Sequence, residues 1–118
     1  MLRSTLDFLL DIQKETQLLM EHTSNKDYKQ FITDDILLRA TERSLEIIGE
    51  SVKNIPEEFR IRHPLIDWKG ITGMRDKLIH HYFGVDYEIV WSVIKEEIPL
   101  LLETVEAIIA HEKNNKIT

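Results

Sequence analysis

The chain has 118 residues, of which 42% are hydrophobic and 31% charged, and its net charge is −6. This length suits one compact domain with a core of its own, and the acidic balance argues against a broadly basic nucleic-acid binder, so any RNA site must rest on a few local cations. The absence of cysteine excludes disulfides, thiol catalysis and cysteine zinc sites. Residues 1–10 carry no signal-peptide pattern, and no apolar run approaches the roughly 20 residues of a membrane span, so we expect a cytoplasmic protein with no membrane segment.

The N-terminal part of the chain predicts two long helices. Leucines recur at helical spacing through residues 1–22, which is typical of an amphipathic helix, and a polar connection follows. The second helix is expected to begin near Thr33, which can cap it, with Asp34 and Asp35 favourably placed in its first turn. This helix should end just before Pro56.

The middle of the chain predicts a short helical turn and a third long helix. The turn covers residues 57–61, and a loop should follow because a residue that precedes a proline is pushed away from helical geometry. The third helix is expected from about Trp68 to Tyr82. Gly84, just past its end, is a plausible left-handed cap.

The last part of the chain predicts one long but interrupted helix. Asp86 can cap a segment over residues 87–112, and Pro99 should kink or split it because proline has no backbone N–H to donate. The polar tail 113–118 should be frayed. No period-two alternation and no hairpin turn predicts a strand. Residues 1–118 therefore predict a single all-α domain, an up-and-down bundle of four to five helices.

The third helix carries the candidate chemistry. The Arg75 guanidinium can hold a phosphate with two parallel hydrogen bonds, and the His80 imidazole can exchange a proton near neutral pH, which are the needs of RNA phosphodiester cleavage. Asp76 is four residues before His80 and can orient its ring. On an ideal helix, however, Arg75 and His80 point about 140° apart. Either the helix end bends or two protomers build the site together.

Plainer interpretations of the same residues stay open. The spacing of Arg75 and His80 occurs by chance in many helices, and Asp76 with His80 is also an ordinary surface pair. Tyr82 fits a core residue with its hydroxyl at the rim. The adjacent His80 and His81 diverge on a helix, whereas a helical zinc pair needs a spacing of four, so we expect no metal site.

The second helix carries a charged face. Arg39 and Arg43 share it with Glu42, Glu46 and Glu50, and its simplest interpretation is a solvated surface with ion pairs inside the helix. The alternative is that Arg39 and Arg43 line an RNA groove.

The third helix and its flanks resemble the HEPN superfamily and, within it, the HepT-like toxin ribonucleases. The family pattern is arginine, four residues, histidine, any residue and tyrosine, and Arg75, His80 and Tyr82 meet it. The likeness covers nearly the whole chain, because the flanking segments also match in order. These segments are Trp68–Asp86, Ile89–Trp91, Ile47–Glu50, Pro56–Glu58 and Ile98–Leu101. One departure is Asp76, a position that is often asparagine in similar sequences; it adds negative charge beside a phosphate site.

This resemblance implies a homodimer in which two motif copies meet in a cleft, and RNA cleavage that needs no metal and no cofactor. Arg75 would bind the scissile phosphate and stabilise the charge of the transition state. His80 would act as general base or acid on the RNA 2′-hydroxyl or the leaving oxygen. The expected products are a 2′,3′-cyclic phosphate and a 5′-hydroxyl, from a transfer or messenger RNA.

The resemblance also implies a partner. Such proteins are typically the toxin of a type VII-like toxin–antitoxin pair, and a small nucleotidyltransferase antitoxin of the MNT type transfers AMP from ATP to the motif tyrosine, here Tyr82. A different class of function is a non-catalytic helical module that binds a nucleotide or a nucleotidyltransferase, with Arg75 holding a phosphate and His80 only structural. A structural dimer without any site is the third possibility.

Overall fold

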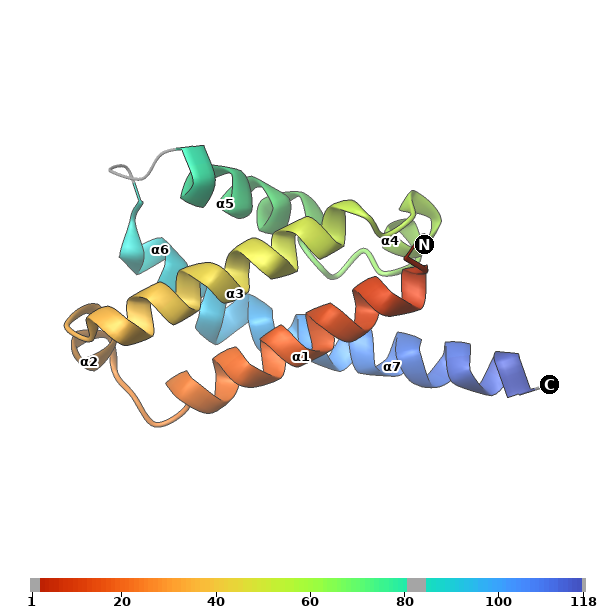
Figure 1. Ribbon diagram of the computed structural model, residues 1–118, viewed down its shortest axis with the longest axis horizontal. Helices are drawn as coiled ribbons and strands as arrows, with labels where there is room; N and C mark the ends of the chain where they lie inside the picture. Colours follow the sequence, from red (N-terminus) through yellow and green to blue (C-terminus); the bar gives the residue numbers. More distant parts are fainter. Residues whose placement is uncertain (1–2, 81–84, 118) are drawn as a thin grey trace.

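A computed structural model of the protein describes residues 3–80 and 85–117, without the side chains of residues 79–80 and 114–117. Within these ranges the chain forms helices and no strand, which confirms the predicted all-α class. Four long helices make up the bundle (Figure 1): α1 (Thr5–Thr23), α3 (Asp35–Lys53), α5 (Trp68–His80) and α7 (Ile98–Ile117). Shorter elements connect them: α2 (Tyr28–Ile32), α4 (Glu57–Arg62), α6 (Tyr87–Ser92) and the π-helix η2 (Val93–Glu97).

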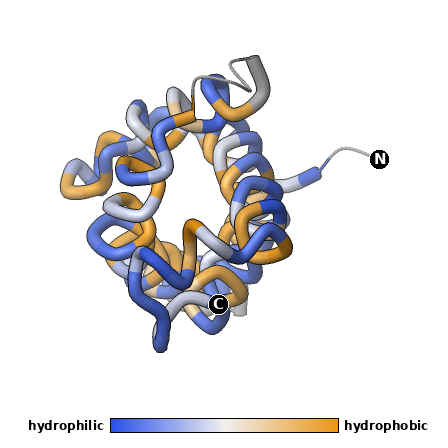
Figure 2. The backbone as a smooth tube through the Cα atoms, turned by 90° about the vertical axis from the view of Figure 1, so that its left-hand side faces the viewer, coloured by the Kyte–Doolittle hydropathy of each residue, from blue (hydrophilic) through white to orange (hydrophobic). Residues whose placement is uncertain are grey.

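Helix α3 lies at the centre of the packing. It packs against α1 and α5, and α1 packs in turn against α7. Successive long helices run in alternating directions (Figure 1), so α3 and α5 are antiparallel neighbours. Seen along the long axis in Figure 2, hydrophobic and hydrophilic stretches alternate on the helices, as expected of amphipathic helices around a core. The fully buried core residues include Leu9, Ile12, Phe31, Ile48, Val52, Ile98, Leu101 and Val105.

The start of α3 corrects the sequence-based prediction by one residue. Asp34, not Thr33, is the N-cap, and its carboxylate accepts a hydrogen bond from the backbone N–H of Leu37 at 3.0 Å. Thr33 instead ends α2, where its hydroxyl donates to the carbonyl of Lys29 at 2.7 Å. The predicted end of this helix before Pro56 is confirmed, since α3 ends at Lys53.

Helix α2 was not expected, because residues 22–27 were interpreted as a polar connection and no helix was predicted over residues 28–32. Asp27 caps it, and the side chain of Gln30 accepts a hydrogen bond back from the Asp27 N–H, which makes a reciprocal capping box. Phe31 anchors it in the core, with its ring centroid 4.8 Å from that of Trp91. A short helix with one buried aromatic residue leaves too few positions for a periodic signal.

The interruption of the last helix also differs from the prediction. Asp86 caps α6 as expected, accepting from the N–H groups of Glu88 and Ile89. The break, however, is the π-helix η2 one turn before Pro99, which itself sits in the first turn of α7. A wider turn accommodates the proline ring and the carbonyl that proline leaves without a donor. Helix α7 then continues to Ile117 rather than ending near Glu112.

Two further features bear on the expectations. Helix α5 begins at Trp68 as predicted, whereas its expected last residues up to Tyr82 and the cap at Gly84 lie outside the described residues. None of the helices in the described ranges combines the length and apolar character that crossing a membrane needs.

Candidate active site at the α3–α5 contact

Arg75 lies on the face of α5 that meets α3. The two helices approach closely at Gly49, where a β-carbon would overlap Cβ of Arg75 and come within 2.7 Å of its Cγ. Only glycine leaves room for this arginine stem. The Arg75 side chain is consequently 21% exposed, which is low for an arginine, and its guanidinium reaches the surface between the helices.

Two carboxylates hold this guanidinium. The NH2 nitrogen of Arg75 lies 2.8 Å from Oε2 of Glu50 on α3, and its NH1 nitrogen lies 3.1 Å from Oδ1 of Asp76. The same Asp76 oxygen accepts from Nζ of Lys53 at 2.7 Å. We call these four side chains, Glu50, Arg75, Asp76 and Lys53, the charge cluster. It alternates negative and positive groups across the contact of α3 with α5.

The charge cluster fixes the protonation of Asp76. Hydrogen bonds from Lys53 and then Arg75 hold the pKa of the Asp76 carboxyl below its ordinary value, because both cations favour the charged form. Nε of Arg75 is buried and makes no hydrogen bond among the described residues. One donor of this guanidinium is thus held away from water without a described acceptor.

The remaining motif residues are only partly described. His80 is the last residue of α5, and its side chain lies outside the described part of the chain, as do His81 and Tyr82 altogether. The expected hydrogen bond from Asp76 to His80 is therefore not described. The structure brings Arg75 and Asp76 together with two residues of α3, Glu50 and Lys53.

Helix α3 was interpreted too simply from the sequence. One ion pair inside the helix is confirmed, from Arg43 to Glu46 at 3.4 Å, and Arg39 is exposed. Glu50, in contrast, pairs with Arg75 of another helix, and Glu42 accepts a hydrogen bond from the Tyr87 hydroxyl of α6 at 2.5 Å. The charged face therefore forms contacts between helices as well as facing solvent.

Two residues of the site were missed by sequence reasoning. Lys53 is the first, and no local pattern marks it, since its partner Asp76 is 23 residues away. The second is Gly49, which does carry a signal. A glycine in the middle of an otherwise strong helix costs about 1 kcal/mol relative to alanine, so it indicates a close approach by another segment.

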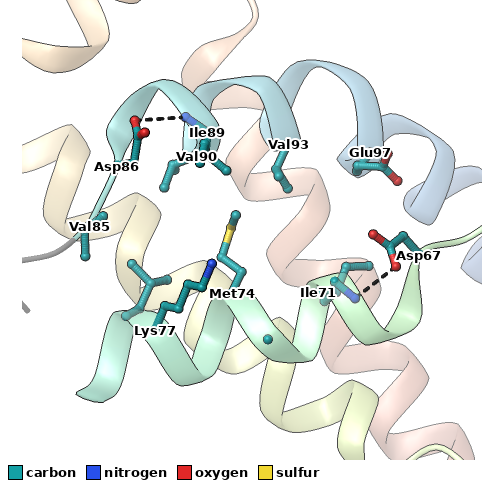
Figure 3. Close-up of a pocket in the computed structure, with 13 residues that line it drawn as sticks. Asp67, Ile71, Met74, Lys77, Val85, Asp86, Ile89, Val90, Val93 and Glu97 are labelled. Carbon is teal, nitrogen blue, oxygen red and sulfur yellow. Dashed lines mark hydrogen bonds between the residues drawn. The ribbon is translucent and has the colours of Figure 1, made fainter. Parts of the chain in front are cut away.

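A groove opens on another side of α5. It has a volume of about 640 Å³ and separates α5 from α6 and η2. Met74 of α5 and Val93 of η2 project toward one another across it (Figure 3). Ile89, on its edge, is 52% exposed. The other lining side chains are four apolar ones, Ile71, Leu78, Val85 and Val90, and four charged ones, Asp67, Lys77, Asp86 and Glu97.

The three acidic residues of this groove do not gather at one point, since Asp67 and Glu97 lie at one end of it and Asp86 at the other (Figure 3). Asp67 lies near the start of α5, Asp86 caps α6 and Glu97 ends η2. In the described ranges as a whole, no three His, Asp or Glu side chains come together as a metal site requires.

Comparison with known proteins assigns the family. The chain matches the ribonuclease HepT-like family over residues 12–108. It is 50% identical over 106 residues to "Putative RNase TTE0752" of Caldanaerobacter subterraneus subsp. tengcongensis, covering 90% of this chain and 95% of that protein. It is 46% identical over 101 residues to "Probable ribonuclease HepT" of Thermococcus cleftensis, covering 86% and 92%. No solved structure matches the chain. With its helical bundle and its arginine–histidine–tyrosine motif, the chain belongs to the HepT-like ribonucleases of the HEPN superfamily.

Proposed function

We propose that this protein is a metal-independent endoribonuclease that acts in the cytoplasm. The observation that carries the proposal is the Arg75 guanidinium, which α3 and α5 hold at their contact and whose partners in the described part of the chain are two side-chain carboxylates. Glu50 is 56% exposed, so an RNA phosphate can replace it on the same donors at little cost. An RNA phosphodiester offers two non-bridging oxygens in a similar arrangement and carries the same single negative charge as the carboxylate.

The chemistry assigns one task to each motif residue. His80 takes the proton of an RNA 2′-hydroxyl, and the 2′-oxygen attacks the adjacent phosphorus. The bond from phosphorus to the 5′-oxygen breaks, and a protonated imidazole gives its proton to that leaving oxygen. Arg75 stabilises the additional negative charge on the phosphate in the transition state. The products are a 2′,3′-cyclic phosphate and a 5′-hydroxyl, and the RNA supplies its own nucleophile.

Arg39 and Arg43 are proposed to hold the RNA backbone beside the site. Arg43 precedes Glu50 by seven residues on α3, so it lies about 10 Å along the helix on the same face. Because α5 runs antiparallel to α3, this direction leads from Arg75 toward the end of α5 at His80. Two exposed arginines there supply local positive charge to a chain whose net charge is −6.

The active form is proposed to be a homodimer. Arg75 faces α3, and His80 lies about 140° further round an ideal helix, so a second copy of the chain could supply the group that completes the site at one phosphate. The apolar groove between α5 and α6 supports this, because it lies on the motif helix and leaves Ile89 half exposed. We assign a second copy of the chain to this groove.

Control of the enzyme is proposed to be a modification of Tyr82. In this scheme the protein is the toxin of a type VII-like pair, and an antitoxin of the MNT nucleotidyltransferase type is its partner. The Tyr82 oxygen attacks the α-phosphorus of ATP, pyrophosphate leaves, and AMP remains on the tyrosine. A bulky anion two residues from His80 would block RNA and repel its phosphates.

The deciding experiment is RNA cleavage in EDTA by wild type, His80→Ala and the control His22→Ala, which removes an exposed histidine from α1. Intact mass confirms that Tyr82 is unmodified, and circular dichroism confirms equal folding. We expect cleavage by wild type and His22→Ala and none by His80→Ala. No cleavage by folded, unmodified wild type would favour a non-catalytic nucleotide-binding module, and equal cleavage by all three would indicate a contaminating nuclease.

A further inference from the structure

The charge cluster contains a pair, Lys53 and Asp76, that the RNA chemistry above does not use. Lys53 belongs to α3, outside the motif, yet its Nζ makes the shortest ion pair of the cluster, 2.7 Å from Oδ1 of Asp76. Arg75 reaches the same oxygen at a longer distance, 3.1 Å. The two cations therefore share one carboxylate oxygen.

The geometry of α3 explains why the side chains of Glu50 and Lys53 both reach α5. Glu50 and Lys53 are three residues apart and lie on one helix face. Gly49, at the start of this turn, lets Arg75 approach the α3 backbone. Glu50 then meets NH2 of Arg75, while Lys53 meets Asp76, the neighbour of Arg75 in sequence.

The sharing has a consequence for Arg75. An oxygen that accepts from two cations is held between them and cannot move closer to either, and the second cation also offsets the negative field of the carboxylate at the phosphate site. Without Lys53, Asp76 would hold NH1 of Arg75 alone, and the cluster would change from two cations and two anions to one cation and two anions. Both changes weaken the attraction of Arg75 for an RNA phosphate.

We propose that Lys53 is a positioning residue, which holds the Asp76 carboxylate so that NH1 of Arg75 stays available to the scissile phosphate. This inference rests on the proposed ribonuclease function. It also explains how the negative charge of Asp76 is tolerated beside the phosphate site, since Lys53 of the neighbouring helix α3 compensates it. Lys53 acts through Asp76 and not by touching RNA.

The test is a double-mutant cycle of Lys53→Gln and Asp76→Asn. Because the pair is partly exposed, Lys53→Gln should lower kcat/KM for RNA cleavage by about two- to fivefold in the wild-type background. In the Asp76→Asn background, where no carboxylate competes for Arg75, the same substitution should have almost no effect. Lys53→Arg, which keeps the charge, should restore activity. Lys14→Gln on α1 removes an exposed charge elsewhere and should leave kcat/KM unchanged.

The outcomes separate the inference from the function on which it rests. Equal losses from Lys53→Gln in both backgrounds would overturn the inference, because Lys53 would then act on RNA directly. An absence of cleavage by wild type would overturn the proposed function instead. A carbon-13 NMR titration of the Asp76 carboxyl measures its pKa, and so tests the ion pair with Lys53, without any substrate. We expect its pKa to rise in Lys53→Gln, and an unchanged pKa would overturn the inference whatever the cleavage assay gives.

Discussion

Gly49 of α3 lies so close to Arg75 of α5 that a methyl group at position 49 would overlap the arginine stem. The nearest obstructing atom is Cβ of Arg75, which no side-chain rotation can move because the backbone fixes its position. Gly49→Ala should therefore push the two helices apart and lower the free energy of unfolding by about 1–3 kcal/mol, despite the higher helix propensity of alanine. Denaturant unfolding followed by circular dichroism measures this loss.

Gly73 of α5 provides the matched control. It is also a helical glycine, but a β-carbon there meets no atom within 4 Å. Gly73 also lines the groove assigned to the second copy, so both glycine variants are compared at concentrations where the protein is monomeric. There Gly73→Ala should raise the free energy of unfolding by about 0.5–1 kcal/mol, because only helix propensity acts. Equal effects of the two substitutions would mean that α3 and α5 are further apart than described.

The stability contribution of Asp76 should depend on pH. Lys53 and Arg75 hold its pKa below the ordinary value of 3.8, so the folded state favours the charged carboxylate. A depressed pKa gives stability that is fully present above the unfolded-state pKa and lost as the pH falls through the folded-state pKa. Wild type should thus be more stable than Asp76→Asn at neutral pH, and the difference should shrink below about pH 4. Denaturant titrations of both proteins across this range measure it, and a constant difference would contradict the ion pairing.

If a second copy of the chain occupies the groove, glutamate substitutions at two exposed isoleucines should have different effects on the oligomeric state. Ile89 lies on the groove and Ile36, 82% exposed, lies away from it, yet each is in the first turn of a helix that an aspartate caps. Glutamate is well tolerated in a first turn. Ile89→Glu should therefore convert a dimer to a folded monomer, whereas Ile36→Glu should stay dimeric. Light scattering after size-exclusion chromatography reads the masses, and a dimer that survives Ile89→Glu would place the interface elsewhere.

The helices were largely predictable because their signals are local. The all-α class, the end of α3 before Pro56, the start of α5 at Trp68 and the cap at Asp86 all follow from short-range spacing, proline and capping chemistry. The same locality caused the error at Thr33, since two adjacent residues could each cap a helix and only the course of α2 decides between them.

The site was predictable only in part, because it depends on how α3 and α5 are aligned. The motif identified Arg75 and Asp76, but their partners Glu50 and Lys53 follow from the packing of two helices that are about 25 residues apart in sequence. Glu50 was assigned to a solvated face because spacing within one helix cannot reveal contact with another. Gly49 was the one local sign of that contact.

The proposed control by AMP predicts that the protein can be modified only if Tyr82 carries its hydroxyl oxygen. Tyr82→Phe removes only the hydroxyl that would attack ATP, so the protein should fold normally and gain no AMP mass when it is incubated with ATP and its nucleotidyltransferase partner. Tyr28→Phe, a change on α2, should be modified like wild type. Intact-mass spectrometry distinguishes the three proteins. Recovery of AMP on Tyr82→Phe would contradict the assignment, as would wild type that stays unmodified.

The same variant tests why modification would silence the enzyme. In the proposed scheme, AMP on Tyr82 would add a phosphate two residues from His80 in the sequence, and this phosphate would compete with RNA for the Arg75 guanidinium and repel the RNA backbone. Wild type pretreated with ATP and the partner should therefore lose RNA cleavage, whereas Tyr82→Phe given the same treatment should keep the activity that it had before. Loss of cleavage by treated Tyr82→Phe would mean that the partner inhibits by binding alone, and the bound nucleotidyltransferase would then be the inhibitor.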